Sequence, residues 1–152
     1  MQGAGGVGCD FCDLSQFENA EILIVRDLTF FAADAFAAPQ VLPGAGVVSP
    51  IAHRESPFDL TADEWVDTRT LLHEAKRALD ERLSPDGYNL IWNVCEDAGQ
   101  VVAHAHLHVI PRFHDEPLAG HGARWHLKQS TNRRPDPLAR GRGRALAAGI
   151  SD

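Results

Sequence analysis

Residues 104–111 read HAHLHVIP, a run in which three histidines alternate with apolar residues. Because successive side chains of a β-strand point to opposite faces, His104, His106 and His108 are predicted to share one face, with the apolar residues turned toward a core. Pro111 has no backbone N–H to donate, so we expect the strand to end there. Three histidines on one face indicate a functional site. The pattern also fits a metal site made by this strand alone, or an exposed polar face.

The composition is that of an ordinary globular protein. A length of 152 residues with 44% hydrophobic content predicts one domain with its own core. The formal net charge of -7 gives no reason to expect a nucleic-acid partner. No run approaches the roughly 18 apolar residues of a membrane span, and the first residues lack the basic start of a signal peptide. We therefore expect no membrane partner and a cytoplasmic location.

Hydrophobic patterning predicts an α+β fold with a mostly antiparallel sheet. A long helix should begin after Thr61, where Glu64 completes a capping box, and should stop at the Pro-Asp-Gly turn of residues 85–87. Short runs rich in β-branched and aromatic residues predict four further strands, at 21–26, 29–36, 47–49 and 88–94. The helix interrupts the strands only once, so most neighbouring strands can pair through short connections.

Cys9 and Cys12 form a CxxC pair near the start of the chain. This spacing suits a metal knuckle or a redox pair, and a metal knuckle needs further ligands from elsewhere in the chain. The three cysteines cannot form a full disulfide framework, which agrees with a reducing compartment.

Positive charge gathers at the C-terminus. Seven of the 14 lysines and arginines lie from Arg124 onward, opposed by only two acidic residues. We expect a flexible lead-in over residues 1–8, a domain over 9–128 and a basic Pro/Arg/Gly-rich tail over 129–152. The tail could reach a polyphosphate or a partner subunit, or it could be a solvated tail with no partner.

Residues 99–112, GQVVAHAHLHVIPR, resemble the signature of the histidine triad (HIT) superfamily. The likeness extends to Asn93 and to the loop and helix start of residues 53–64. It implies a five-stranded antiparallel sheet with one long helix, usually paired into a homodimer. It also implies the activity of a nucleotide hydrolase or nucleotidyltransferase. Such enzymes act at the α-phosphate of a nucleoside phosphoramidate, a dinucleoside polyphosphate or a sugar nucleotide.

The same resemblance assigns roles to single residues. His106 would be the nucleophile, since a neutral imidazole attacks phosphorus at physiological pH without a separate base. His108, Asn93 and Gln100 would bind the substrate phosphate, as fixed donors do for developing charge. For Asn93 and Gln100, the alternative interpretation is ordinary turn chemistry.

Zinc-containing members of the superfamily supply ligands at the positions occupied here by Cys9, Cys12, His53 and His104. Two thiolates and two imidazoles would complete a closed tetrahedral set, which is typical of a structural zinc. We expect one such zinc per chain. The alternative is that the two cysteines are free thiols and that His104 only packs in the core.

Together these features predict a zinc-stabilised nucleotide hydrolase with a nucleotidyl-His106 intermediate. A dinucleoside polyphosphate such as diadenosine tetraphosphate is the first choice of substrate, beside a nucleoside phosphoramidate. A uridylyl- or adenylyltransferase is the enzymatic alternative. A nucleotide-binding scaffold protein with incidental turnover is the alternative from another class.

Overall fold

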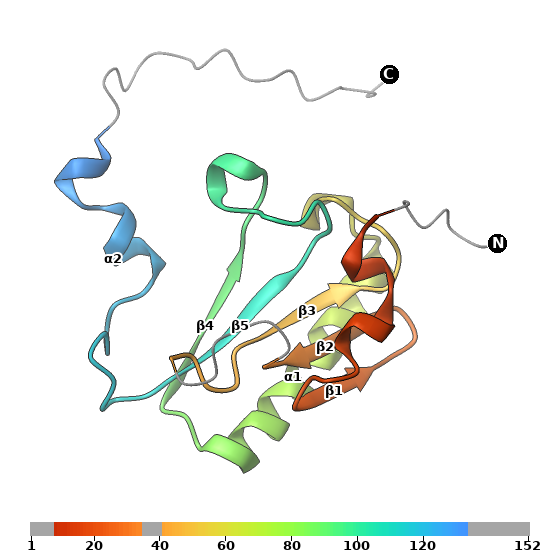
Figure 1. Ribbon diagram of the computed structural model, residues 1–152, viewed down its shortest axis with the longest axis horizontal. Helices are drawn as coiled ribbons and strands as arrows, with labels where there is room; N and C mark the ends of the chain where they lie inside the picture. The colour runs from red at the N-terminus through yellow and green to blue at the C-terminus, as the bar shows by residue number, and fades with distance from the viewer. Residues whose placement is uncertain (1–7, 35–40, 134–152) are drawn as a thin grey trace. The chain divides into compact units, whose positions relative to one another are not determined.

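The computed structural model describes residues 8–34 and 41–133, and its centre is one antiparallel sheet with a long helix (Figure 1). The five strands follow the order β1-β2-β3-β5-β4, and every neighbouring pair is antiparallel. The elements are β1 (Ile22–Val25), β2 (Thr29–Ala33), β3 (Gly46–Pro50), α1 (Ala62–Leu83), β4 (Gly87–Trp92) and β5 (Leu107–Arg112). The expected α+β class, five-stranded sheet and single long helix are confirmed.

Helix α1 begins and ends as its sequence predicts. The Thr61 hydroxyl accepts a hydrogen bond from the Glu64 N–H, and the Glu64 carboxylate accepts one from the Thr61 N–H, so both halves of the capping box are present. Ser84 adopts the left-handed conformation with φ of 47° and ends the helix, where its N–H donates to the Asp80 carbonyl. Each end of the 22-residue helix therefore has a capping interaction from its own side chains or backbone.

The main core lies between α1 and one face of the sheet. Fully buried side chains of the helix, Leu71 and Leu79 among them, pack against Phe31 and Val48 of the central strands. Each side chain of this size stabilises the fold by about 1.5–3 kcal/mol when it leaves water. Leu107 and Val109 of β5 belong to the same core, so alternate β5 residues face the helix, as expected.

The opposite face of the sheet carries a second, smaller core. Phe11 and Phe17, from the N-terminal turns η1 (Asp10–Cys12) and η2 (Leu14–Phe17), pack against Phe30 and Ala32 of β2. This segment covers the β2 side of that face. The β3 and β5 part of the same face borders a cavity, described below.

The histidine strand is shorter at its start than predicted, and this prediction is corrected. Strand β5 begins at Leu107, so His104 and His106 precede it. The backbone N–H of Ala105 donates to the Arg54 carbonyl at 2.5 Å, and the Ala105 carbonyl accepts from the Ser49 hydroxyl at 2.9 Å. Loop and side-chain partners thus replace a strand ladder at these residues.

Pro111 does not end β5, which is a second correction. The strand continues to Arg112, and Pro111 pairs with Tyr88 of β4. The pairing of β5 with β3 stops at Val109, so the proline has a partner strand on one side only. A residue without an N–H is tolerated at such a position. Strands β1, β3 and β4 lie within two residues of their predicted ends, whereas β2 stops at Ala33 and the predicted residues 35 and 36 lie outside the described residues.

The chain divides into two compact units, Met1–Ala119 and Gly120–Asp152. The described part of the second unit holds the short helix α2 (Ala123–Leu127), and the ring of His121, which precedes the helix, stacks on Trp125 with centroids 4.0 Å apart. Most of the expected basic tail lies outside the described residues, and its limits stay a prediction. Among residues 8–34 and 41–133, no helix is both long and apolar enough to cross a bilayer.

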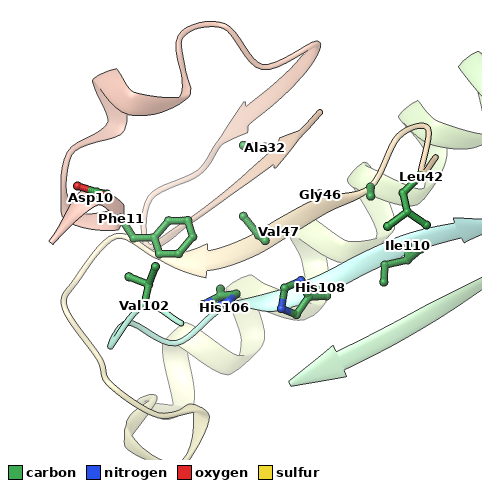
Figure 2. Close-up of a pocket in the computed structure, with 11 residues that line it drawn as sticks. Asp10, Phe11, Ala32, Leu42, Gly46, Val47, Val102, His106, His108 and Ile110 are labelled. Carbon is green, nitrogen blue, oxygen red and sulfur yellow. The ribbon is translucent and has the colours of Figure 1, made fainter. Parts of the chain in front are cut away.

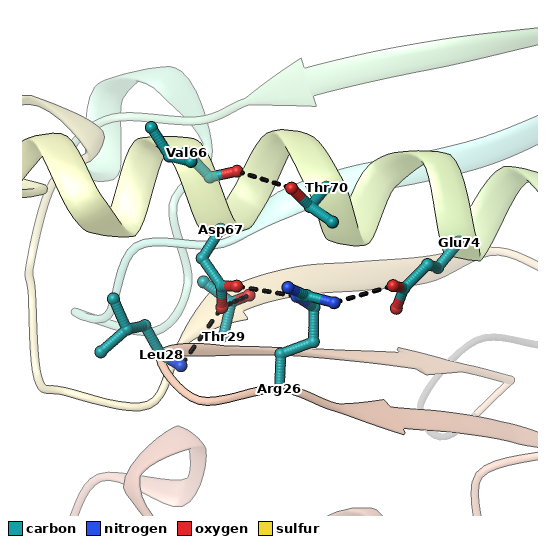
Figure 3. A network of polar contacts seen from close by, with 7 residues as sticks. All are labelled: Arg26, Leu28, Thr29, Val66, Asp67, Thr70 and Glu74. Atoms are coloured by element: carbon teal, nitrogen blue, oxygen red, sulfur yellow. Dashed lines mark hydrogen bonds and ion pairs between the residues drawn. The ribbon is translucent and has the colours of Figure 1, made fainter.

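A polar network ties α1 to the β1–β2 hairpin (Figure 3). Asp67 accepts hydrogen bonds from the Arg26 guanidinium at 2.7 Å, the Thr29 hydroxyl at 2.8 Å and the Leu28 N–H at 3.2 Å. The Arg26 guanidinium also donates to Glu74 at 2.7 Å. Burial by itself would raise the pKa of Asp67, but the three donors outweigh it, and the pKa is lowered.

We predict that Asp67→Asn destabilises the protein by about 1–3 kcal/mol at neutral pH, because the buried acceptor loses its charge-assisted bonds. A carboxylate whose pKa is lowered in the folded state stabilises the fold at pH values above its unfolded pKa of about 4. This contribution is lost as the pH falls from there through the lowered pKa of the folded state. Urea unfolding at pH 7 and pH 3 should therefore give a smaller difference between wild type and variant at the lower pH. Glu21→Gln, which breaks an exposed ion pair with Arg82, is the control and should change stability little. An equal loss at both pH values would contradict the prediction.

Candidate functional site

The three histidines of residues 104–108 occupy three different environments. His104 is fully buried, His106 is 6% exposed and His108 is half-buried. The His106 and His108 rings lie 4.9 Å apart and border the same cavity, whereas His104 turns toward the N-terminal cysteines. The expectation of one shared face therefore holds for His106 and His108 only, and a metal site made by this strand alone is excluded by the direction of His104.

The ring of His104 is fixed at both nitrogens. Its Nε2 lies 2.8 Å from the Pro50 carbonyl oxygen. A carbonyl can only accept, so Nε2 carries the proton and Nδ1 presents a lone pair. This Nδ1 lies 3.4 Å from Cys9 Sγ and 3.6 Å from Cys12 Sγ. Burial lowers the pKa of His104 despite the opposing effect of the Pro50 carbonyl, so the neutral form that binds metals is favoured.

Four side chains meet at this point and could hold a metal ion. The ligand atoms of Cys9, Cys12, His53 and His104 all lie within 4.8 Å of one another, and His53 Nδ1 is 3.3 Å from Cys12 Sγ. With metal–sulfur bonds of about 2.3 Å and metal–nitrogen bonds of about 2.0 Å, a tetrahedral ion separates a sulfur ligand from a nitrogen ligand by about 3.5 Å. The observed sulfur–nitrogen distances therefore fit a tetrahedral Cys₂His₂ site.

His106 is oriented by the backbone of its neighbour. Its Nδ1 lies 2.8 Å from the His104 carbonyl oxygen, so Nδ1 donates and Nε2 is left with the lone pair. The Phe11 ring packs against the imidazole with centroids 5.0 Å apart. In the sequence Phe11 lies between Cys9 and Cys12. The turn that carries the two thiols therefore also places an aromatic ring beside His106.

His108 and Asn93 lie together at the end of β4. The Asn93 amide nitrogen is 3.5 Å from His108 Nε2, and since an amide nitrogen only donates, Nε2 is the acceptor and Nδ1 carries the proton. Burial lowers the pKa of His108, and the positive charge that His106 could carry lowers it further. His108 is therefore neutral near pH 7, with Nδ1–H available as a donor.

Gln100 lies beside His104, and its Nε2 donates to the His104 carbonyl at 3.5 Å. Its Oε1 accepts from the Cys95 N–H at 2.8 Å, and its Nε2 donates to the Glu55 carbonyl at 2.8 Å. It does not border the cavity that contains His106 and His108. In this structure its amide joins two loops, and its contact with phosphate stays a prediction.

A cavity of about 380 Å³ opens beside the two histidines (Figure 2). Most of its walls are apolar, and its lining comes from η1, β2, β3 and β5 and from the loops that precede β3 and β5. At Gly46 an added Cβ would lie 2.5 Å from the Ala32 carbonyl oxygen, so only glycine allows β2 and β3 to approach this closely beneath the cavity. A mostly apolar pocket with a few polar groups at one point is the usual form of a small-molecule site.

Sequence reasoning missed several residues that shape the site. Phe11 could have been suspected from its place between Cys9 and Cys12. The Pro50 carbonyl and the Ser49 hydroxyl, which hold His104 and Ala105, left no signal, because they act across more than 50 positions of the chain.

Comparison with known proteins gives one consistent family. The profile described as HIT domain matches residues 17–115. "Protein hit" of Bacillus subtilis is 34% identical over an alignment of 125 residues, which covers 77% of this chain and 78% of that protein. The bis(5'-adenosyl)-triphosphatase of Dictyostelium discoideum is 30% identical over 94 residues, covering 62% of this chain and 61% of that enzyme.

Solved structures agree with the sequence comparison. The crystal structure of a HIT family protein from Bacillus anthracis superposes with a TM-score of 0.64 and 29% identity, covering 83% of this chain and 85% of that one. The antiparallel five-stranded sheet and the single long helix are therefore the architecture of this family.

We predict that the purified chain retains about one divalent metal ion per molecule, since the two thiols and two oriented imidazoles are spaced as a tetrahedral ion requires. Cys12→Ser should lose the ion and lower the melting temperature, because Cys12 contacts both histidines of the cluster. Cys95→Ser, which changes an exposed cysteine, is the matched control. Elemental analysis and thermal unfolding provide the readouts, and a metal-free wild type as stable as a metal-loaded one would refute the prediction.

Proposed function

The chain belongs to the HIT domain family, and we propose that it hydrolyses nucleotides through attack of His106 on an α-phosphate. The observation that carries the proposal is the hydrogen bond from His106 Nδ1 to the His104 carbonyl at 2.8 Å. In the neutral ring this bond puts the lone pair on Nε2, and His106 borders a mostly apolar cavity, where a neutral imidazole is a competent nucleophile.

The reaction has two displacement steps. In the first, the Nε2 lone pair forms a bond to phosphorus, and the bond from phosphorus to the leaving oxygen or nitrogen breaks, with the electron pair going to the leaving group. The product is a nucleotidyl-histidine whose ring is positively charged. The His104 carbonyl still accepts from Nδ1–H and so stabilises that charge. Water then attacks phosphorus, the imidazole leaves as a neutral ring, and the proton from water passes to solvent or product.

His108 and Asn93 are proposed to bind the phosphate during both steps. His108 lies beside His106 and is neutral, so its Nδ1–H can donate to a phosphoryl oxygen. The Asn93 amide lies next to His108 and is proposed as a second donor, which requires one amide N–H to exchange the Gly99 carbonyl for the substrate. Gln100 is proposed as a third donor, which requires its amide to exchange a present backbone partner for the substrate.

The proposed substrate is a dinucleoside polyphosphate, for example diadenosine tetraphosphate, or a nucleoside phosphoramidate. The similarity to an enzyme named bis(5'-adenosyl)-triphosphatase supports the first class. The cavity of about 380 Å³ with apolar walls is of a size that accepts one nucleoside.

The metal ion is proposed to be a structural zinc held by Cys9, Cys12, His53 and His104. Paired thiolates and imidazoles with no open position are the ligand set that structural zinc prefers. When bound, zinc would supply charge neutralisation and rigidity, and the residues around it would hold the N-terminal turn beside His106. A reducing compartment such as the cytoplasm suits these thiols, because it keeps cysteines available as metal ligands.

We predict that His106→Asn lowers kcat by at least about a thousandfold on a fluorogenic adenosine phosphoramidate and on diadenosine tetraphosphate, because the nucleophile is removed. The melting temperature should stay close to that of the wild type. His73→Asn makes the same exchange at an exposed position of α1 and is the matched control. Undiminished turnover by His106→Asn would contradict the mechanism.

A homodimer is also proposed, formed through the β4 side of the sheet. Strand β4 ends the sheet order and carries Leu90, which is 54% exposed. Trp65 of α1, itself 44% exposed, packs against Trp92 with centroids 5.9 Å apart and extends the apolar surface.

Light scattering on the purified protein should give twice the chain mass, and Leu90→Glu should shift it toward the monomer. A monomeric wild type at working concentration would reject the dimer.

A further inference from the structure

Three consecutive loop residues, His53, Arg54 and Glu55, connect separate parts of the site. His53 is one of the four candidate metal ligands. The Arg54 carbonyl accepts from the N–H of Ala105, the residue between His104 and His106, at 2.5 Å. The Glu55 carbonyl accepts from Gln100 at 2.8 Å. The position of this short segment therefore determines where the backbone before the proposed nucleophile lies.

The segment is held in turn by one ion pair, in which the carboxylate is buried and the guanidinium is partly exposed. The Arg54 guanidinium reaches both carboxylate oxygens of Glu64, with Nε at 3.1 Å from each and Nη2 at 3.0 Å from Oε1. Glu64 is 3% exposed, and it also accepts from the Thr61 N–H at 2.7 Å. Burial would raise the pKa of this carboxyl, but the guanidinium and the Thr61 N–H outweigh it and the pKa is lowered.

The pair is anchored to a rigid part of the fold. Glu64 lies in the first turn of α1, on the same buried face of the helix as Leu71 and Leu79 of the main core. Charge-assisted bonds to both oxygens of one carboxylate fix direction as well as distance. Because its guanidinium is fixed to the start of α1, the backbone of Arg54 is also held in a fixed position relative to the helix.

We propose that Arg54 and Glu64 are positioning residues for His106. The pair fixes the Arg54 carbonyl, the carbonyl fixes Ala105, and Ala105 sets the direction in which His106 Nε2 points. Neither side chain borders the cavity, so the pair acts on the alignment of the reacting atoms rather than on nucleotide binding. This inference rests on the proposed function and adds two residues that the histidine motif does not contain.

Arg54→Met tests the inference directly, with turnover of the fluorogenic adenosine phosphoramidate as the readout. Since a displacement of about 1 Å at the reacting atoms costs up to roughly a hundredfold in rate, we expect kcat to fall by about 10- to 100-fold, with KM changed less than about twofold. Arg54→Lys keeps a cation beside Glu64 and should recover a large part of kcat. Lys76→Met removes an exposed ion pair from the same helix and is the control that should leave both constants unchanged.

Metal content and melting temperature of every variant separate positioning from a general structural role. The inference requires Arg54→Met to keep the wild-type metal content, to remain folded at the assay temperature and to lose kcat. An unchanged kcat, a change confined to KM, or a loss of activity that follows loss of metal in both Arg54→Met and Arg54→Lys would each overturn it. Absence of turnover in the wild type would instead overturn the proposed function, so the two failures are distinguishable.

Discussion

The geometry of the site depends on the way His104 is held. Its Nε2–H donates to the Pro50 carbonyl, which directs Nδ1 toward Cys9 and Cys12. Its own carbonyl accepts from His106, which directs the other imidazole into the cavity. The Pro50 carbonyl thus sets the tautomer of the fully buried His104, and the His104 carbonyl sets that of His106. If His104 moved, both the four candidate metal ligands and the proposed nucleophile would change position.

One face of the sheet forms the main core, and the other face carries the candidate site. One face packs its apolar residues against α1 and forms the main core. The other face carries the N-terminal turns, which bring Phe11 against His106 and place two thiols near His104. Residues from the two ends of the domain meet on this face, so folding of the sheet assembles the site. The Arg54–Glu64 pair links that assembly to the start of the helix on the opposite side.

Much of this could be predicted from sequence because the signals were local. The capping box of Thr61 and Glu64, the period-2 pattern of β5 and the CxxC spacing each lie within a few residues. The histidine motif extended the prediction to distant metal ligands, and the structure brings all four together. What could not be predicted depends on long-range partners. The bend that takes His104 out of the strand arises from bonds of Ala105 to Ser49 and Arg54, which no local pattern encodes.

The central claim is that His106 Nε2 becomes covalently bonded to a nucleotide during turnover. Rapid quenching of the wild-type protein with diadenosine tetraphosphate or the adenosine phosphoramidate, followed by peptide mass spectrometry, measures this directly. The account predicts an acid-labile adenylyl group on the peptide that contains residues 104–111, attached at His106 and absent from His106→Asn. Turnover that proceeds with no adduct, or an adduct at another residue, would contradict it.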